Sequence, residues 1–178
     1  MASNMLAKTR TAEELQKLVD GAFELNSIFD NIAYGLTEDL HLPKFGDFVH
    51  HTLAHSFPVD YADYIQNFAN ARGVRIVRGV VPSHQTIYSS PITAMEEGYG
   101  ALVHYETMLD NAINVCIEDG DKPTEDFLRG ISSNILPYYI HQLSRFVIGL
   151  KAFDEDNLVV MFNEGYEGYL VDYFKDKN

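Results

Sequence analysis

The feature that most constrains the fold is an apolar pattern with helical spacing in residues 11–39. Apolar residues recur there at alternating steps of three and four, at Leu15, Leu18, Ala22, Leu25, Phe29, Ile32 and Leu36. This spacing puts them on one face of a long helix, and that face needs cover from the rest of the chain. Thr11, followed by Glu13 and Glu14, is typical of a helix N-terminus. We therefore predict a helix over residues 11–39 with Thr11 as its cap.

Prolines and glycines divide the rest of the chain into further helical segments. Because proline suits the first turn of a helix and glycine its C-terminal end, they predict helices at residues 43–73, 91–118 and 122–153. Ser90 is expected to cap the helix at residues 91–118. Pro58 and Pro137 fall inside the other two helices, and we expect them to bend these helices rather than end them, because the apolar pattern continues on both sides. A short helix at about residues 158–175 follows.

Residues 73–91 differ from the helical segments, because they combine a short apolar run with polar residues and end at Pro91. A strand here would have no partner strand. An extended segment of ~19 residues can span a helix of ~30 Å and so connect two helices that run parallel. The order of elements therefore predicts an all-α fold: a four-helix bundle over about residues 11–153, with one long crossover, in a single domain of residues 1–178.

Composition narrows the range of functions. The 178 residues are 46% hydrophobic, which is enough for one domain with a sizeable core. The formal net charge of −13 argues against nucleic-acid binding, which needs clustered Lys and Arg. The sequence contains no stretch of ~18 apolar residues that would predict a membrane span. Residues Met1 to Thr11 lack the apolar region of a signal peptide. With Cys116 as the single cysteine, no intrachain disulfide can form, so we expect a cytoplasmic protein.

Short segments of the chain are similar to those of ferritins. Residues 38–45 resemble the turn between the first two ferritin helices, and residues 66–76 resemble the end of the second helix and the start of the crossover. Phe23-Glu24-Leu25 and residues 120–128 resemble parts of the first helix and of the turn before the fourth. On residues 12–153 the chain thus resembles the ferritin-like family, including its Dps-like members. This resemblance implies a ferritin-like bundle and iron as the bound metal.

The resemblance also implies a place for a di-iron site. The family supplies a Glu from each of two helices and a Glu-x-x-His pair, or a carboxylate variant, from the others. Glu24 and Glu106 lie close to two of these positions. Residues 53–60 contain no Glu, and residues 132–141 contain no carboxylate. We therefore expect a reduced or absent ferroxidase centre. Any enzymatic activity would then be a weak ferroxidase activity at a di-iron site.

Other residues could build an unusual metal site. His51 and His55 are four residues apart, a usable spacing for metal ligands on one helix face. Asp60 and Asp63 follow in the same segment, and with His55 they could join Glu24 and Glu106. The alternative is that all of these are solvated surface residues, as charged side chains usually are.

The sequence thus supports two functional hypotheses. One is an iron-binding or iron-storing ferritin-like protein; the other is a helical-bundle binding or assembly protein without metal. In both cases we expect a homo-oligomer, at least a dimer, because apolar residues lie outside the core stripe. These are Phe23, Ile28 and Tyr34 in the first helix and Val74, Ile76, Val77, Val80 and Val81 in the crossover.

Overall fold

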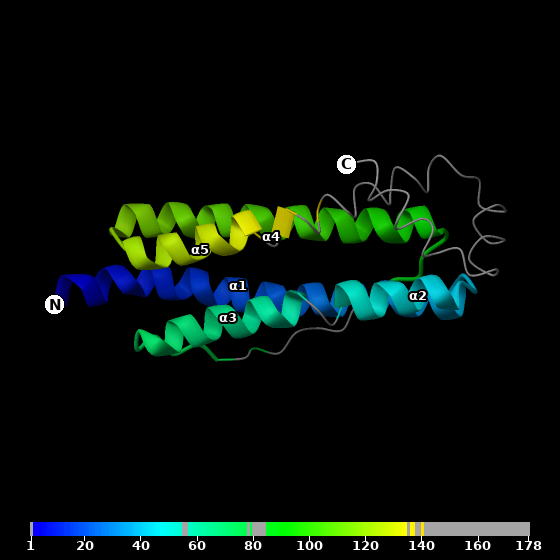
Figure 1. Ribbon diagram of the computed structural model, residues 1–178, viewed down its shortest axis with the longest axis horizontal. Helices are drawn as coiled ribbons and strands as arrows, with labels where there is room; N and C mark the ends of the chain where they lie inside the picture. Colours follow the sequence, from blue (N-terminus) through cyan, green and yellow to red (C-terminus); the bar gives the residue numbers. More distant parts are fainter. Residues whose placement is uncertain are drawn as a thin grey trace.

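The computed structural model describes the backbone of residues 2–54, 57–77, 79, 85–134, 136–137 and 140. Every regular element in these ranges is a helix (Figure 1). The α-helices are α1 (Ala2–Tyr34), α2 (Pro43–Val49), α3 (Phe57–Ala71), α4 (Pro91–Asp119) and α5 (Lys122–Asn134). Two π-helical turns, η1 (Gly35–Asp39) and η2 (His50–Ala54), flank α2. The predicted all-α class is confirmed, and no described helix is long and apolar enough to cross a membrane.

The first helix begins earlier than the sequence suggested. α1 starts at Ala2, so Thr11 lies within the helix and the prediction that it is the cap was wrong. The stretch before Thr11 contains neither Gly nor Pro, so nothing in it stops the helix from extending. Thr11 is instead buried, and its hydroxyl donates a hydrogen bond of 3.2 Å to Asp119 Oδ2 at the end of α4.

The turn between α1 and α2 is wider than an α-helical turn. The Leu40 N–H donates to the Gly35 carbonyl over 3.0 Å, a bond from residue i+5 to residue i. The apolar spacing did not predict these π-helical turns. Pro58 lies in the first turn of α3, where a missing N–H costs little. Because residues 55–56 lie outside the described ranges, the bend predicted at Pro58 stays a prediction.

The chain runs along α1, returns along α3, crosses back and then runs along α4 in the direction of α3 (Figure 1). In its described residues, 74–77, 79 and 85–90, the segment between α3 and α4 contains neither helix nor strand. Val77 exchanges two hydrogen bonds with the Gln16 side chain, of 2.7 and 3.1 Å. Farther along α1, Asn31 donates to the Thr86 carbonyl and to the Tyr88 hydroxyl, each over 3.1 Å. The crossover therefore lies along the outside of α1.

The start of α4 and the turn into α5 match the prediction. Ser90 Oγ accepts a hydrogen bond from the Thr93 N–H, and Pro91 is the first residue of α4. Gly120 ends α4 with φ of 69°, a left-handed conformation that glycine adopts readily. Beyond α5, Leu136, Pro137 and Ile140 are also helical. Because residues 135 and 138–139 lie outside the described ranges, the bend predicted at Pro137 stays a prediction. The rest of the helix predicted to residue 153 and the helix at 158–175 also lie outside the described residues.

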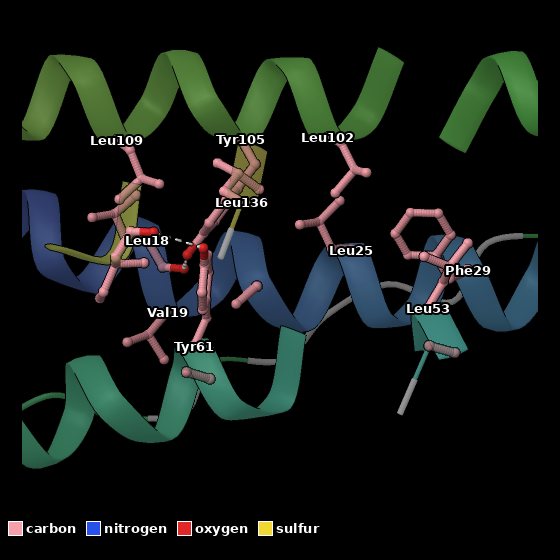
Figure 2. Close-up of a cluster of buried hydrophobic side chains, with 14 of the residues drawn as sticks. Leu18, Val19, Leu25, Phe29, Leu53, Tyr61, Leu102, Tyr105, Leu109 and Leu136 are labelled. Carbon is pink, nitrogen blue, oxygen red and sulfur yellow. Dashed lines mark hydrogen bonds between the residues drawn. The ribbon is translucent and has the colours of Figure 1, made fainter. Parts of the chain in front are cut away.

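The core lies between these helices. α1 packs against both α3 and α4, and α5 packs against α4. α5 also meets α3, where the rings of Phe68 and Phe127 stack with centroids 4.2 Å apart. In Figure 2 the side chains of Leu25 and Leu102 point toward one another from α1 and α4. All seven apolar residues of the predicted α1 stripe are buried.

Candidate functional site

The structure describes four of the five predicted metal ligands, and these lie on α1, α3 and α4. Glu24 on α1 is exposed, as are Asp60 and Asp63 on α3, whereas Glu106 on α4 is partly buried. His55 lies outside the described residues. In the part of the chain that is described, no three His, Cys, Asp or Glu side chains form a group that could hold a metal ion. The di-iron assignment therefore stays a prediction from the resemblance.

Tyrosines occupy the centre of the interior, between α1, α3, α4 and α5. Tyr61 and Tyr105 are almost fully buried, and their ring centroids are 6.0 Å apart (Figure 2). Tyr105 donates a hydrogen bond of 2.8 Å to the Leu18 carbonyl, and Tyr61 donates one of 3.1 Å to the Ile131 carbonyl. Each buried hydroxyl therefore has an acceptor, as buried polar groups require.

The interior also disfavours charge. Burial, with a smaller contribution from Tyr61, raises the pKa of the Tyr105 hydroxyl far above its ordinary value. Leu18, Leu102 and Leu109 surround the tyrosines and are at most 1% exposed. An apolar, closely packed interior of this kind is suited to stability rather than to holding charged ligands.

A pocket of about 260 Å³ lies on the outside of the α1–α4 contact. Its apolar lining comes from both helices: Gly21, Leu25 and Ile28 on α1, and Ala101, Tyr105 and Met108 on α4. The other lining residues are ionisable, namely Glu24 on α1 and Glu97 and His104 on α4. One predicted metal residue, Glu24, thus shares a pocket with Glu97 and His104, whereas Glu106 does not line it.

Sequence reasoning missed Glu97 as a site residue. The signal was present, because Glu97, Ala101, His104 and Met108 follow one another at steps of four, three and four along α4. On a helix these steps define one face. The opposing α1 residues Gly21, Glu24, Leu25 and Ile28 have the same property. Only the contact between α1 and α4 shows that these two faces meet.

A second pocket, of about 400 Å³, lies where η1 meets α2. Asp30, Glu38, Asp47 and His50 contribute its ionisable groups. Asp30 Oδ1 lies 3.3 Å from His50 Nδ1, and both side chains are 42% exposed. Three carboxylates and one imidazole therefore line this pocket together with Ala33, Tyr34 and Gly46.

A buried polar cluster joins the ends of α3, α4 and α5. Arg72 Nη1 donates a hydrogen bond of 2.8 Å to Asp121 Oδ1 and also contacts the Thr124 hydroxyl. Asp121 caps α5, because its Oδ1 accepts from the Thr124 N–H at 3.2 Å. Burial alone would raise the pKa of Asp121, but hydrogen bonds from Arg72 and Thr124 outweigh it and lower the pKa below its ordinary value. This cluster is structural, since its groups satisfy one another.

Comparison with models of known protein families gives no match for this chain, and comparison with curated proteins gives none either.

Proposed function

We propose that this chain is a ferritin-like four-helix bundle that acts as a self-assembling binding protein, with a packed interior in place of a ferroxidase centre. The observation that carries the proposal is the Tyr61–Tyr105 pair at the middle of the bundle. A di-iron site needs carboxylates that converge there. Buried tyrosines and leucines fill that space instead, and both tyrosine hydroxyls already donate to backbone carbonyls.

The path of the chain supports the ferritin-like arrangement. Ferritin-like bundles have one long crossover between helices that run in the same direction. Here α3 and α4 run in the same direction, and the crossover between them is held to α1 near both ends by Gln16 and Asn31. A cytoplasmic location is part of the proposal, supported by Cys116, a single buried thiol.

Exposed apolar residues support self-assembly. Tyr34, Val77 and Ile87 are 64%, 56% and 82% exposed. Val77 and Ile87 belong to the crossover, which is hydrogen-bonded to α1. Tyr34 lies one helical turn after Asn31, whose side chain donates a hydrogen bond to the crossover at the Thr86 carbonyl. We call these residues the α1–crossover face. Ile76 had been expected to contribute, but it is buried at 5% exposure, and Phe23 and Ile28 pack partly against the core. The predicted apolar surface is therefore narrower than the sequence suggested.

Light scattering tests the assembly. We expect a particle of at least twice the chain mass of 20.2 kDa at micromolar concentration. The double variant Val77→Glu, Ile87→Glu is expected to shift this particle toward monomer. Ile117→Glu is the control. Ile117 is also a half-exposed apolar residue, but it lies near the C-terminal end of α4 and does not belong to the α1–crossover face. A monomeric wild-type protein would refute the assembly proposal.

Iron binding by Glu24, Glu106, His55, Asp60 and Asp63 is the competing function. It is favoured by Glu24, which lines a pocket with Glu97 and His104. Iron content of the purified protein and oxygen-dependent oxidation of ferrous iron discriminate the two functions. We expect neither bound iron nor rapid oxidation, because a site poor in carboxylates does not hold two irons at bridging distance. Rapid oxidation that Glu24→Ala abolishes would establish the iron function instead.

A further inference from the structure

We propose that the α1–α4 pocket binds a small organic cation, an ammonium group attached to an aromatic or short alkyl part. The site goes beyond the proposed assembly and does not depend on it, because none of its lining residues belongs to the α1–crossover face.

The floor of the pocket suits an apolar group. Leu25 and Tyr105 are buried, while Ile28, Ala101 and Met108 are partly buried, so their apolar surfaces are only partly covered by the protein. Gly21 lets Met108 and Tyr105 pack closely against α1, because a Cβ there would lie 3.0 Å from Met108 Cε and 3.2 Å from Tyr105 Cε2. A ligand that covers these side chains gains from the burial of apolar surface.

The size of the pocket limits the ligand. Its volume of about 260 Å³ lies just below the ~300–1,000 Å³ typical of pockets for drug-sized molecules. One aromatic ring with a short arm fits such a volume, whereas a nucleotide or a peptide does not.

The charged groups select a cation. Glu24 on α1 and Glu97 on α4 place carboxylates on both helices that form the pocket. The imidazole of His104 lines the same pocket on α4. The formal net charge of −13 attracts cations toward the surface in general. An anionic ligand of the same shape would meet repulsion from both carboxylates.

The orientation of the ligand follows from this distribution. The apolar part of the ligand lies on Met108 and Tyr105, near Gly21. The ammonium group lies toward Glu97, which precedes Tyr105 by about two helical turns on α4. The ammonium group of the ligand and the carboxylates of the pocket attract one another near solvent. The affinity for the cation should therefore fall as the salt concentration rises.

Phenethylammonium is the test ligand, and phenethyl alcohol is its uncharged counterpart. Titration of each into the full-length protein is followed by the NMR signal of the Met108 methyl group, which reports on this pocket. We expect a saturable shift with phenethylammonium and binding at least about fivefold weaker with the alcohol. Equal affinity for the two compounds would overturn the proposal, because the carboxylates would then have no role.

Variants locate the site. Glu24→Gln combined with Glu97→Gln should weaken phenethylammonium binding by about fivefold or more, and Ala101→Leu should abolish it by filling the pocket. The control is Glu13→Gln combined with Asp110→Asn, which removes one exposed charge from each of the same two helices. Its affinity should stay within about twofold of wild type. An equal loss in control and pocket variants would reveal general charge attraction and overturn the site.

Discussion

The hydroxyl of Tyr105 on α4 donates a hydrogen bond of 2.8 Å to the backbone carbonyl of Leu18 on α1, although 87 positions separate the two residues in sequence. Tyr61 on α3 makes the corresponding bond to Ile131 on α5. The two tyrosines therefore join the helices in two pairs, α4 with α1 and α3 with α5. Neither pair consists of helices that are adjacent in the sequence.

Removal of these hydroxyls should weaken the fold moderately. Tyr105→Phe and Tyr61→Phe keep the buried rings but lose one hydrogen bond each, so we expect each to lower the free energy of unfolding by about 1 kcal/mol. Urea denaturation followed by circular dichroism measures the loss. Unchanged stability in both variants would mean that these bonds contribute nothing net.

Stability should fall at alkaline pH. Burial is the main cause that raises the pKa of Tyr88 from 10.0 to about 12. The folded state therefore favours the neutral phenol, and this contribution is complete below pH 10.0 and is lost as the pH rises through about 12. Thermal unfolding measured at stepwise higher pH should show the decline, and Tyr88→Phe should make it smaller. A wild-type profile that stays flat over this window would contradict the assignment.

Stability should also fall in acid, for a different reason. The pKa of Asp121 lies below its ordinary value of 3.8, so its contribution is present above pH 3.8 and is lost as the pH falls through the folded-state value. Asp121→Asn removes the charge next to Arg72 and weakens the cap of α5, which should cost about 2 kcal/mol at neutral pH. The variant should lose less additional stability in acid than wild type. An equal acid response in both proteins would show that other carboxylates dominate.

Two helical glycines should respond in opposite directions to alanine. A Cβ at Gly46 would lie 2.8 Å from the Ala33 carbonyl oxygen and would overlap the Thr37 hydroxyl, so Gly46→Ala should destabilise by about 2 kcal/mol. At Gly100 on α4 a Cβ would meet nothing within 4 Å, so Gly100→Ala should stabilise by about 0.5–1 kcal/mol. Denaturation of the two variants side by side provides the measurement. A harmless Gly46→Ala would mean that α2 can move away from α1 at little cost.

The thiol of Cys116 should resist modification in the folded protein. It is buried, and this burial is the main cause that raises its pKa to about 11. Because the thiolate is the reactive form, thiol-reactive reagents at mildly alkaline pH should label the folded protein slowly and the protein unfolded in guanidinium rapidly. Labelling at equal rates would indicate that the end of α4 opens readily.

Several elements of the fold could be predicted from sequence because their signals are local. Ser90 and Pro91 at the start of α4 and Gly120 at its end follow from capping and backbone preferences alone. The crossover was predictable from its lack of helical spacing. The π-helical turns were not, because a bond from residue i+5 to residue i changes the apolar pattern too little to detect.

The site was harder to predict than the fold. Glu24 was selected from its position in the resemblance, yet its side chain is exposed and its pocket partners are Glu97 and His104. Spacing shows which residues share a face of one helix, but it does not show which face of another helix lies opposite. That information comes from tertiary packing, which here joins residues of α1 and α4 more than 70 positions apart.

The separation between Leu18 and Tyr105 has a consequence for synthesis of the chain. At ~5–20 residues per second, a ribosome adds Tyr105 roughly 4–17 s after Leu18. The helix that forms most of the core contacts is therefore made first, and α4, which covers one of its sides, is made much later. During those seconds the apolar stripe of α1 is available to other nascent chains or to chaperones. Aggregation during expression should therefore respond to translation speed and to chaperone supply more strongly than in a bundle whose core joins only helices that are adjacent in the sequence.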